Sequence, residues 1–142
     1  VDSMPEDKAN CVLLADRHLG LTASVRGLLE TLFGTVVMVA DAHSMQESAR
    51  RLQPEVAVVD LSLTRESNLD WLRELHRSCP EIKLVVLSVH DESAVQAAAK
   101  AAGADGYVLK RDIATDLLPT IDSLLAGVAV GGSRTKQRQS SR

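Results

Sequence analysis

Two aspartates, a serine and a lysine stand at the ends of short apolar runs, where polar side chains able to do chemistry could gather. Asp60 ends the run VAVVD, and Asp16 directly follows CVLLA. Ser88 ends KLVVLS, and Lys110 ends GYVLK. A carboxylate beside such apolar residues is costly to bury in its charged form unless a cation or a hydrogen-bond donor compensates it. Two carboxylates, a hydroxyl and an ammonium group make a small polar site that suits a carboxylate nucleophile and a divalent cation.

The elements that must position these residues are five short strands that alternate with helices. The strand segments are apolar at nearly every position, which is typical of parallel strands covered on both faces. They begin at Cys11, Thr35, Val56, Lys83 and Gly106. Apolar residues at helical spacing predict helices within residues 21–32, 45–52, 69–75, 95–102 and 117–125. We expect Thr115 or Asp116 to cap the last helix, with Pro119 near its start.

This order of elements predicts an α/β domain of three layers, with a parallel sheet in strand order 2-1-3-4-5 and helices on both faces. In such an open sheet the functional crevice lies beyond the carboxyl ends of the strands. Strands one, three, four and five are neighbours in this order. We therefore expect Asp16, Asp60, Ser88 and Lys110 to converge on one pocket.

Composition limits the partners of this domain. The last nine residues, RTKQRQSSR, carry four of the sixteen cations, which leaves twelve cations against nineteen acids in residues 1–133. An acidic body argues against direct binding to a nucleic acid backbone, which draws on clustered Lys and Arg. No apolar run reaches the length of a membrane span and the N-terminal residues are not signal-like, so we expect a cytoplasmic protein without membrane contact.

The cysteines and histidines show no pattern of their own. Two cysteines make neither a disulfide framework nor a metal-binding spacing, so we expect them to be structural. The four histidines, His18, His43, His76 and His90, lie in different connections without metal-ligand spacing. We expect each histidine to be solvated or hydrogen-bonded locally.

Four segments, in order and spacing, resemble the receiver domain of two-component response regulators, particularly the NarL/FixJ (LuxR-type) branch. These segments are VLLADRH, PEVAVVDLSL, VVLSVHD and AAGADGYVLK. The resemblance implies a flavodoxin-like receiver domain over residues 10–128, between a disordered N-terminus (1–9) and a flexible basic tail or interdomain linker (129–142). It implies a signalling protein of a phosphorelay rather than an enzyme, with a sensor histidine kinase as partner and transcription as the output.

The resemblance also assigns roles to site residues. Asp60 would be the phosphoacceptor, Lys110 its cationic partner, Ser88 the hydroxyl that binds a phosphoryl oxygen, and Tyr107 the rotating switch aromatic. A carboxylate that attacks phosphorus approaches an anion, so an ammonium and a divalent cation are needed to neutralise the transferred oxygens. Phosphorylation would then change the surface of the fourth helix, the fifth strand and the fifth helix.

The expected cofactor is Mg²⁺, held by Asp16, Asp60 and the backbone carbonyl of Ser62. The family usually has two consecutive acids after the first strand, and the second position here is Arg17. An arginine is always charged, so near the metal it would repel Mg²⁺. Its long side chain could instead swing into water, at the loss of one ligand. In both cases we expect Mg²⁺ to bind weakly.

Two other interpretations remain open. Arg17 favours a degenerate, phosphorylation-independent receiver that acts as a dimerisation or docking module. An α/β enzyme or nucleotide binder on the same fold is disfavoured, because the turn DRHLGLTAS has no Gly-rich phosphate cradle and no GxGxxG or Walker sequence occurs. For the receiver, a homodimer is a further possible partner, and DNA would be reached only through an output domain absent from this chain.

Overall fold

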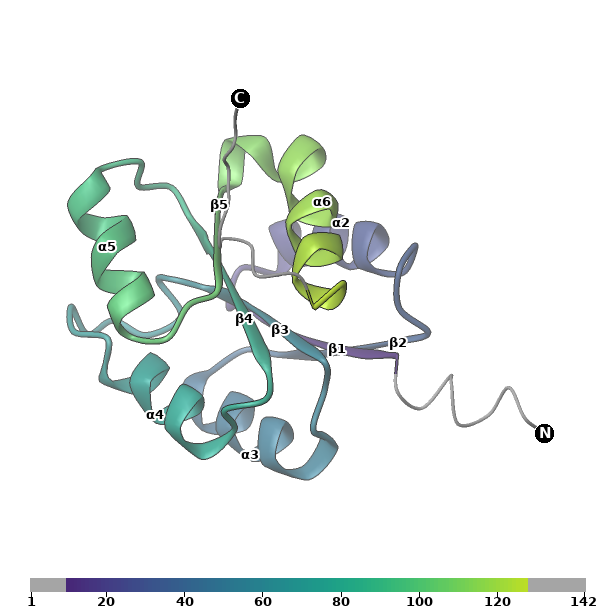
Figure 1. The fold of residues 1–142 in the computed structure, drawn as a ribbon, viewed down its shortest axis with the longest axis horizontal. Coiled ribbons are helices and arrows are strands. Elements are labelled where there is room, and N and C mark those ends of the chain that lie inside the picture. Colours follow the sequence, from purple (N-terminus) through teal and green to yellow (C-terminus); the bar gives the residue numbers. More distant parts are fainter. Residues whose placement is uncertain (1–9, 128–142) are drawn as a thin grey trace.

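Five parallel strands form one sheet in the order β2-β1-β3-β4-β5, which confirms the predicted topology (Figure 1). The strands are β1 (Cys11–Ala15), β2 (Thr35–Val39), β3 (Val56–Asp60), β4 (Lys83–Ser88) and β5 (Gly106–Leu109). This computed structural model describes residues 10–127. The disordered segment predicted for residues 1–9 and the tail predicted for residues 129–142 lie outside the described residues.

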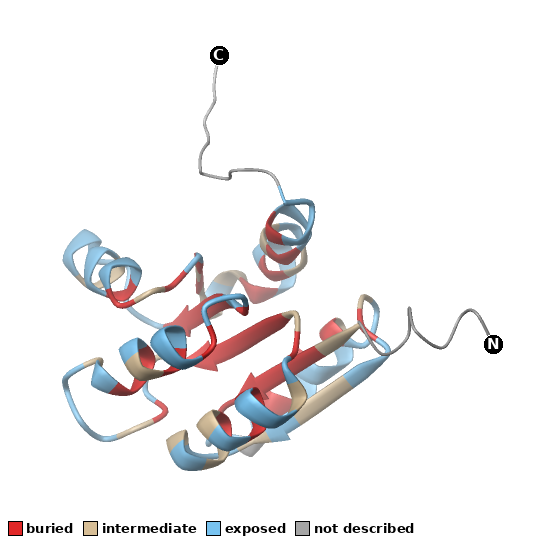
Figure 2. Ribbon diagram, turned by 60° about the horizontal axis from the view of Figure 1, so that its bottom comes forward, coloured by how far each residue is buried: buried red, intermediate tan, exposed pale blue. Residues whose placement is uncertain are grey.

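Helices cover both faces of the sheet (Figure 1). Helices α2 (Leu19–Leu29) and α6 (Ile113–Leu125) lie on one face, and α3 (Ala42–Leu52), α4 (Asp70–Ser78) and α5 (Ser93–Ala101) lie on the other. Alternate residues of each central strand enter different cores: Leu13 and Val59 pack toward α3 and α4, whereas Leu14 and Val58 pack toward α2 and α6. Strand β3 is therefore buried at all five positions (Figure 2). None of the helices within residues 10–127 is long and apolar enough to cross a membrane.

The start of α6 differs from the prediction. A 3-10 turn, η1 (Lys110–Asp112), leads from β5 straight into the helix, so α6 begins at Ile113 and neither Thr115 nor Asp116 caps it. Pro119 consequently lies well inside α6. The proline removes one backbone donor, but buried apolar residues before and after it hold the helix on the sheet. Those buried residues are Ile113, Leu117, Ile121 and Leu124.

Helix α5 is weakly anchored compared with its neighbours. Within α5 only Ala99 is fully buried, whereas α4 buries Trp71, Leu72 and Leu75. The neighbouring Ala98 is exposed. Because an alanine methyl removes far less apolar surface from water than a leucine side chain does, α5 gains little from its contact with the sheet.

Candidate functional site

The two acids of the site are brought side by side by the pairing of β1 with β3. Ala15 pairs with Val59 in the parallel register, so Asp16 and Asp60, which follow them, lie level at the carboxyl edge. Both residues are almost inaccessible to solvent, with 2% and 1% of their surface exposed. The prediction that these two carboxylates meet at the strand ends is confirmed.

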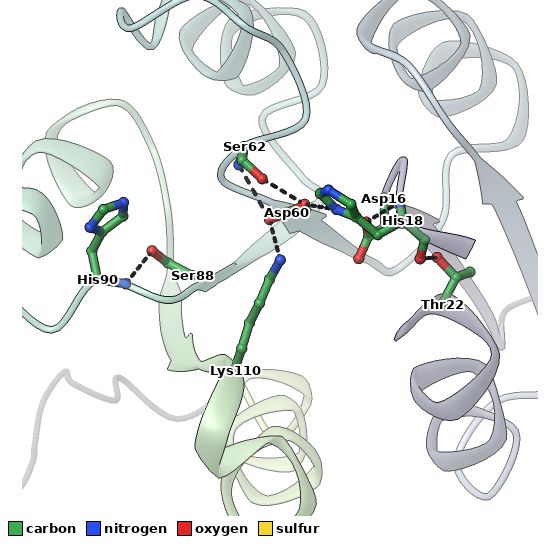
Figure 3. A network of polar contacts seen from close by, with 8 residues as sticks. All are labelled: Asp16, His18, Thr22, Asp60, Ser62, Ser88, His90 and Lys110. Carbon is green, nitrogen blue, oxygen red and sulfur yellow. Dashed lines mark hydrogen bonds and ion pairs between the residues drawn. The ribbon is translucent and has the colours of Figure 1, made fainter. Parts of the chain in front are cut away.

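The registers of β4 and β5 bring Ser88 and Lys110 to the same edge. Asp60 pairs with Leu87, so Ser88 lies one position further along, and Ser88 in turn pairs with Leu109, the residue before Lys110. Asp60, Ser88 and Lys110 all line one cavity of about 620 Å³, between the loop after β3 and the loop after β4. Asp16, which we expected in the same pocket, meets Asp60 at the strand ends but does not line this cavity. Figure 3 shows the Lys110 side chain reaching up to Asp60 from the end of β5.

The same local turn follows three of these strands. In each case a side-chain oxygen at the strand end accepts a hydrogen bond from the backbone N–H two residues later. The donor and acceptor residues are His18 and Asp16 at 2.8 Å, Ser62 and Asp60 at 3.2 Å, and His90 and Ser88 at 3.0 Å. Asp and Ser commonly form such turns, because their short side chains reach the backbone just ahead. Each turn holds the polar side chain at the edge of the sheet (Figure 3).

Asp60 is held in its charged form by its neighbours. The Lys110 Nζ lies 3.0 Å from Asp60 Oδ1, and the Ser62 hydroxyl donates to Oδ2 at 2.9 Å. Burial raises the pKa of Asp60, but the hydrogen bonds and charge of Lys110 and the hydrogen bonds from Ser62 outweigh it. The pKa therefore lies below its ordinary value of 3.8. Asp60 is an ionised, buried carboxylate beside an ammonium group, as a nucleophile toward phosphorus requires.

Asp16 is less well satisfied. Its Oδ1 accepts the His18 N–H, but Oδ2 is buried and has no hydrogen-bond partner among the described residues. Burial raises the pKa of Asp16; the His18 hydrogen bond opposes the increase, and the negative charge of Asp60 adds to it. A buried carboxylate oxygen without a donor is costly and is well placed to accept a cation.

His18 belongs to the site, although we expected it only to be solvated or hydrogen-bonded locally. Its ring Nδ1 lies 3.3 Å from Asp16 Oδ1 and 3.4 Å from Asp60 Oδ2 (Figure 3). One donor atom from each of the three residues lies within 4.8 Å of the others, close enough to share a metal ion. The expected local hydrogen bond to Asp16 exists, but the contact with Asp60 depends on the turn after β1. Only the spacing of two residues from Asp16 could have signalled it.

Arg17 lies outside this cluster. The residue is exposed, and within residues 10–127 it forms no ion pair or hydrogen bond with Asp16 or Asp60. Of the two orientations that we considered, the structure has the one toward water. The second carboxylate that the resemblance leads us to expect at this position is nonetheless missing.

Ser88 and Tyr107 are linked through the loop after β4. Ser88 is buried and accepts the backbone N–H of His90, while the Tyr107 hydroxyl donates to the His90 carbonyl at 2.7 Å. Tyr107 is half-buried and does not line the cavity that contains Asp60. The hydroxyls of Ser88 and Tyr107 therefore form hydrogen bonds with the same loop residue, His90, from two strands.

Comparison with known proteins places this geometry among signalling domains. A family profile described as the response regulator receiver domain matches residues 12–122. The nitrate/nitrite response regulator protein NarP of Escherichia coli (strain K12) is 35% identical over 136 residues, which cover 94% of this chain and 63% of NarP. The response regulator UvrY of the same strain is 29% identical over 119 residues, 82% of this chain and 54% of UvrY. The chain thus spans less than two thirds of these relatives.

Solved structures show the same fold. A two-component response regulator of the LuxR family from Aurantimonas sp. SI85-9A1 superposes with a TM-score of 0.76 at 28% identity, covering 84% of this chain and 86% of that chain. The non-phosphorylated receiver domain of the stress response regulator RcsB from Escherichia coli gives a TM-score of 0.73 at 24% identity, covering 83% and 94%. The similarity to the RcsB receiver domain shows a shared fold and nothing further.

Proposed function

Because this chain belongs to the response regulator receiver domain family, in its NarL/FixJ (LuxR-type) branch, we propose that Asp60 accepts a phosphoryl group from a sensor histidine kinase. The observation that carries the proposal is the ion pair between Lys110 Nζ and the buried Asp60 carboxylate, 3.0 Å apart. This pair keeps a nucleophilic oxygen ionised next to a cation that can neutralise an incoming phosphoryl group. Receiver domains of this branch serve signalling and transcription regulation rather than catalysis of metabolism.

In the proposed transfer, an Asp60 oxygen forms a bond to phosphorus as the phosphorus–nitrogen bond of a phosphohistidine breaks. The departing imidazole takes the electron pair of that bond and then a proton. Lys110 compensates the charge of the phosphoryl oxygens, and Ser88, which lines the same cavity, donates its hydroxyl hydrogen to one of them. In the structure, the Ser88 hydroxyl oxygen accepts a hydrogen bond from the His90 backbone N–H at 3.0 Å. The new bond to the phosphoryl group draws Ser88 away from this N–H.

We propose that the signal leaves the site through His90. A shift of the loop after β4 breaks or moves the hydrogen bond from the Tyr107 hydroxyl to the His90 carbonyl. The ring then turns, and the surface made by α5, β5 and α6 changes. Weak anchoring of α5 supports this route, because the helix buries only Ala99.

For the metal, we propose that Mg²⁺ binds weakly to Asp16, Asp60 and the Ser62 carbonyl. The two carboxylates suit the ion, and Oδ2 of Asp16, which has no partner within residues 10–127, can accept a cation. The third donor of the cluster is the ring nitrogen of His18, however, and Mg²⁺ prefers oxygen. When bound, the ion would supply positive charge to the phosphoryl oxygens.

The partners follow from the relatives and remain part of the proposal. NarP and UvrY are named as response regulators, and this chain covers only part of each. We propose that a histidine kinase phosphorylates this domain in the cytoplasm, that the changed surface supports a homodimer, and that DNA is bound only by an output domain outside this chain. The acidic body of residues 1–133 supports the last point.

The rival candidate is a degenerate receiver that works without phosphate, and Arg17 in place of an acid favours it. Intact-mass measurement after incubation with acetyl phosphate and Mg²⁺ decides between them, with Asp60→Asn as the matched control. We expect one phosphoryl group on the parent and none on Asp60→Asn. Equal labelling of both proteins would remove the assignment of Asp60. If acetyl phosphate and a phosphorylated histidine kinase both leave the parent unlabelled, the degenerate receiver is the correct interpretation.

A further inference from the structure

The donor set beside Asp60 does not match a site built only for Mg²⁺. The cluster holds two carboxylates and one imidazole, and a ring nitrogen is a ligand for transition metals rather than for Mg²⁺. Asp16 adds a second observation, because its side chain is fully buried and its Oδ2 has no partner within the described residues. Figure 3 shows Asp16, His18 and Asp60 turned toward one another.

Hydrogen bonding alone explains the position of the His18 ring poorly. Nδ1 is 3.3 Å from Asp16 Oδ1 and 3.4 Å from Asp60 Oδ2. Ordinary N–H···O hydrogen bonds span about 2.7–3.2 Å, and the single hydrogen of Nδ1 cannot point at both oxygens. Ligand atoms about 2.0–2.1 Å from a shared ion lie about 3.3–3.4 Å apart in tetrahedral coordination. The contact with Asp16 is a long hydrogen bond, but one hydrogen cannot serve both oxygens well, and both distances match those between ligands of one ion.

The contacts around the cluster are compatible with such an ion, although Asp60 Oδ2 also accepts the Ser62 hydroxyl at 2.9 Å. Lys110 contacts Oδ1 of Asp60, whereas the His18 ring faces Oδ2, so the ammonium and the ion would use different oxygens. The His18 side chain is 52% exposed, which gives an ion access from solvent and lets water complete its coordination. Arg17 is exposed beside the cluster and forms no ion pair with its acids in the described part of the chain.

We propose that Asp16, His18 and Asp60 form a binding site for a first-row transition-metal ion, which binds there more tightly than Mg²⁺. The inference deepens the proposed function, since the ion would sit beside the proposed phosphoacceptor. It concerns the unphosphorylated protein, however, and does not require that Asp60 ever be phosphorylated. Zn²⁺ and Co²⁺ are the appropriate probes, because imidazole and carboxylate together suit both ions and Co²⁺ reports its ligands in the visible spectrum.

The test is a set of titrations of the full chain with Zn²⁺, Co²⁺ and Mg²⁺, each followed by calorimetry. We expect one Zn²⁺ per chain, bound at least about 100-fold more tightly than Mg²⁺. His18→Ala should weaken Zn²⁺ binding at least about tenfold and leave Mg²⁺ binding within about twofold. The matched control is His43→Ala, which removes an exposed histidine on α3 and should change neither affinity.

Equal Zn²⁺ affinities of the parent and His18→Ala, or equal affinities of the parent for Zn²⁺ and Mg²⁺, would overturn the proposal. Should His18→Ala fail to fold, the parent alone decides: Zn²⁺ must shift the ¹⁵N resonance of His18 Nδ1, and an unchanged resonance also overturns it. The phosphorylation assay is separate. A parent that binds Zn²⁺ through His18 but takes no phosphoryl group would contradict the proposed function and leave the metal site standing.

Discussion

Replacing Asp16 with asparagine should stabilise this domain when no metal is present. The Oδ1 position of asparagine can still accept the His18 N–H, which now bonds Asp16 Oδ1 at 2.8 Å. The amide NH₂ then takes the place of Oδ2, the buried oxygen that lacks a partner within residues 10–127. The substitution thereby removes an unsatisfied acceptor and one of two neighbouring negative charges.

The expected size follows from the distance between the two acids. One carboxylate oxygen of each acid lies within 4.8 Å of the other, and two charges at that separation repel by about 3.5 kcal/mol at an effective dielectric constant of about 20. Lys110, 3.0 Å from Asp60, offsets part of that repulsion. We therefore expect Asp16→Asn to raise the free energy of unfolding by about 2 kcal/mol, or roughly 8 °C in Tm.

Urea denaturation in EDTA at pH 7 measures the effect, with Asp122→Asn as a control that removes an exposed acid from α6. The gain should depend on pH. Because the folded-state pKa of Asp16 is raised above 3.8, its charge costs stability at high pH, and this cost vanishes below 3.8, where the folded and unfolded chains both carry the proton. The gain from Asp16→Asn should therefore shrink as the pH falls. A variant no more stable than the parent at pH 7 would show that Asp16 is already satisfied and refute the reasoning.

Two further substitutions test the site and the fold. Lys110→Met leaves the buried carboxylate of Asp60 without its cation and should lower the free energy of unfolding by about 3 kcal/mol at pH 7. Since the Asp60 pKa is lowered in the parent, this loss of stability should diminish as the pH falls below 3.8. A constant loss across that pH range would contradict the assignment of the ion pair. Gly103→Ala should destabilise the domain by more than about 1 kcal/mol, because the φ of Gly103 is +118° and a Cβ there would lie 2.6 Å from His76. Gly27→Ala, in α2, should stabilise it by about 0.5–1 kcal/mol, because no atom lies within 4 Å of the added Cβ. Thermal melts compare the two variants.

The sheet could be predicted from the sequence because its strands are unusually uniform. Runs such as VAVVD are apolar at every position before the acid, which is typical of strands covered on both faces, and strand ends in a parallel sheet share one edge. The edge strand β2 has a similar apolar run but is only partly buried. The residue types at those ends therefore predicted which side chains meet. Asp60, Ser88 and Lys110 line one cavity as expected.

The remaining features depend on local geometry that a pattern of apolar residues does not encode. His18 reaches Asp60 because the turn after Asp16 directs its ring, and a turn conformation is not visible in residue spacing. The early start of α6 was missed for a different reason. Ile113 precedes Leu117 by one helical repeat, but the proline at position 119 favoured a later start. Burial of Ile113 outweighs that local preference.

Helix α5 sets the sensitivity of the domain. The contact of α5 with the sheet rests on one fully buried alanine within the helix, Ala99, so moving it forfeits little apolar burial. In hydrogen exchange we expect the amides of α5 to exchange through smaller openings than those of α4, which buries Trp71, Leu72 and Leu75. A signal can shift an equilibrium only by its differential interaction with the two states. We therefore expect the alanine content of α5 to keep small the free energy that the proposed phosphorylation of Asp60 needs to displace the helix.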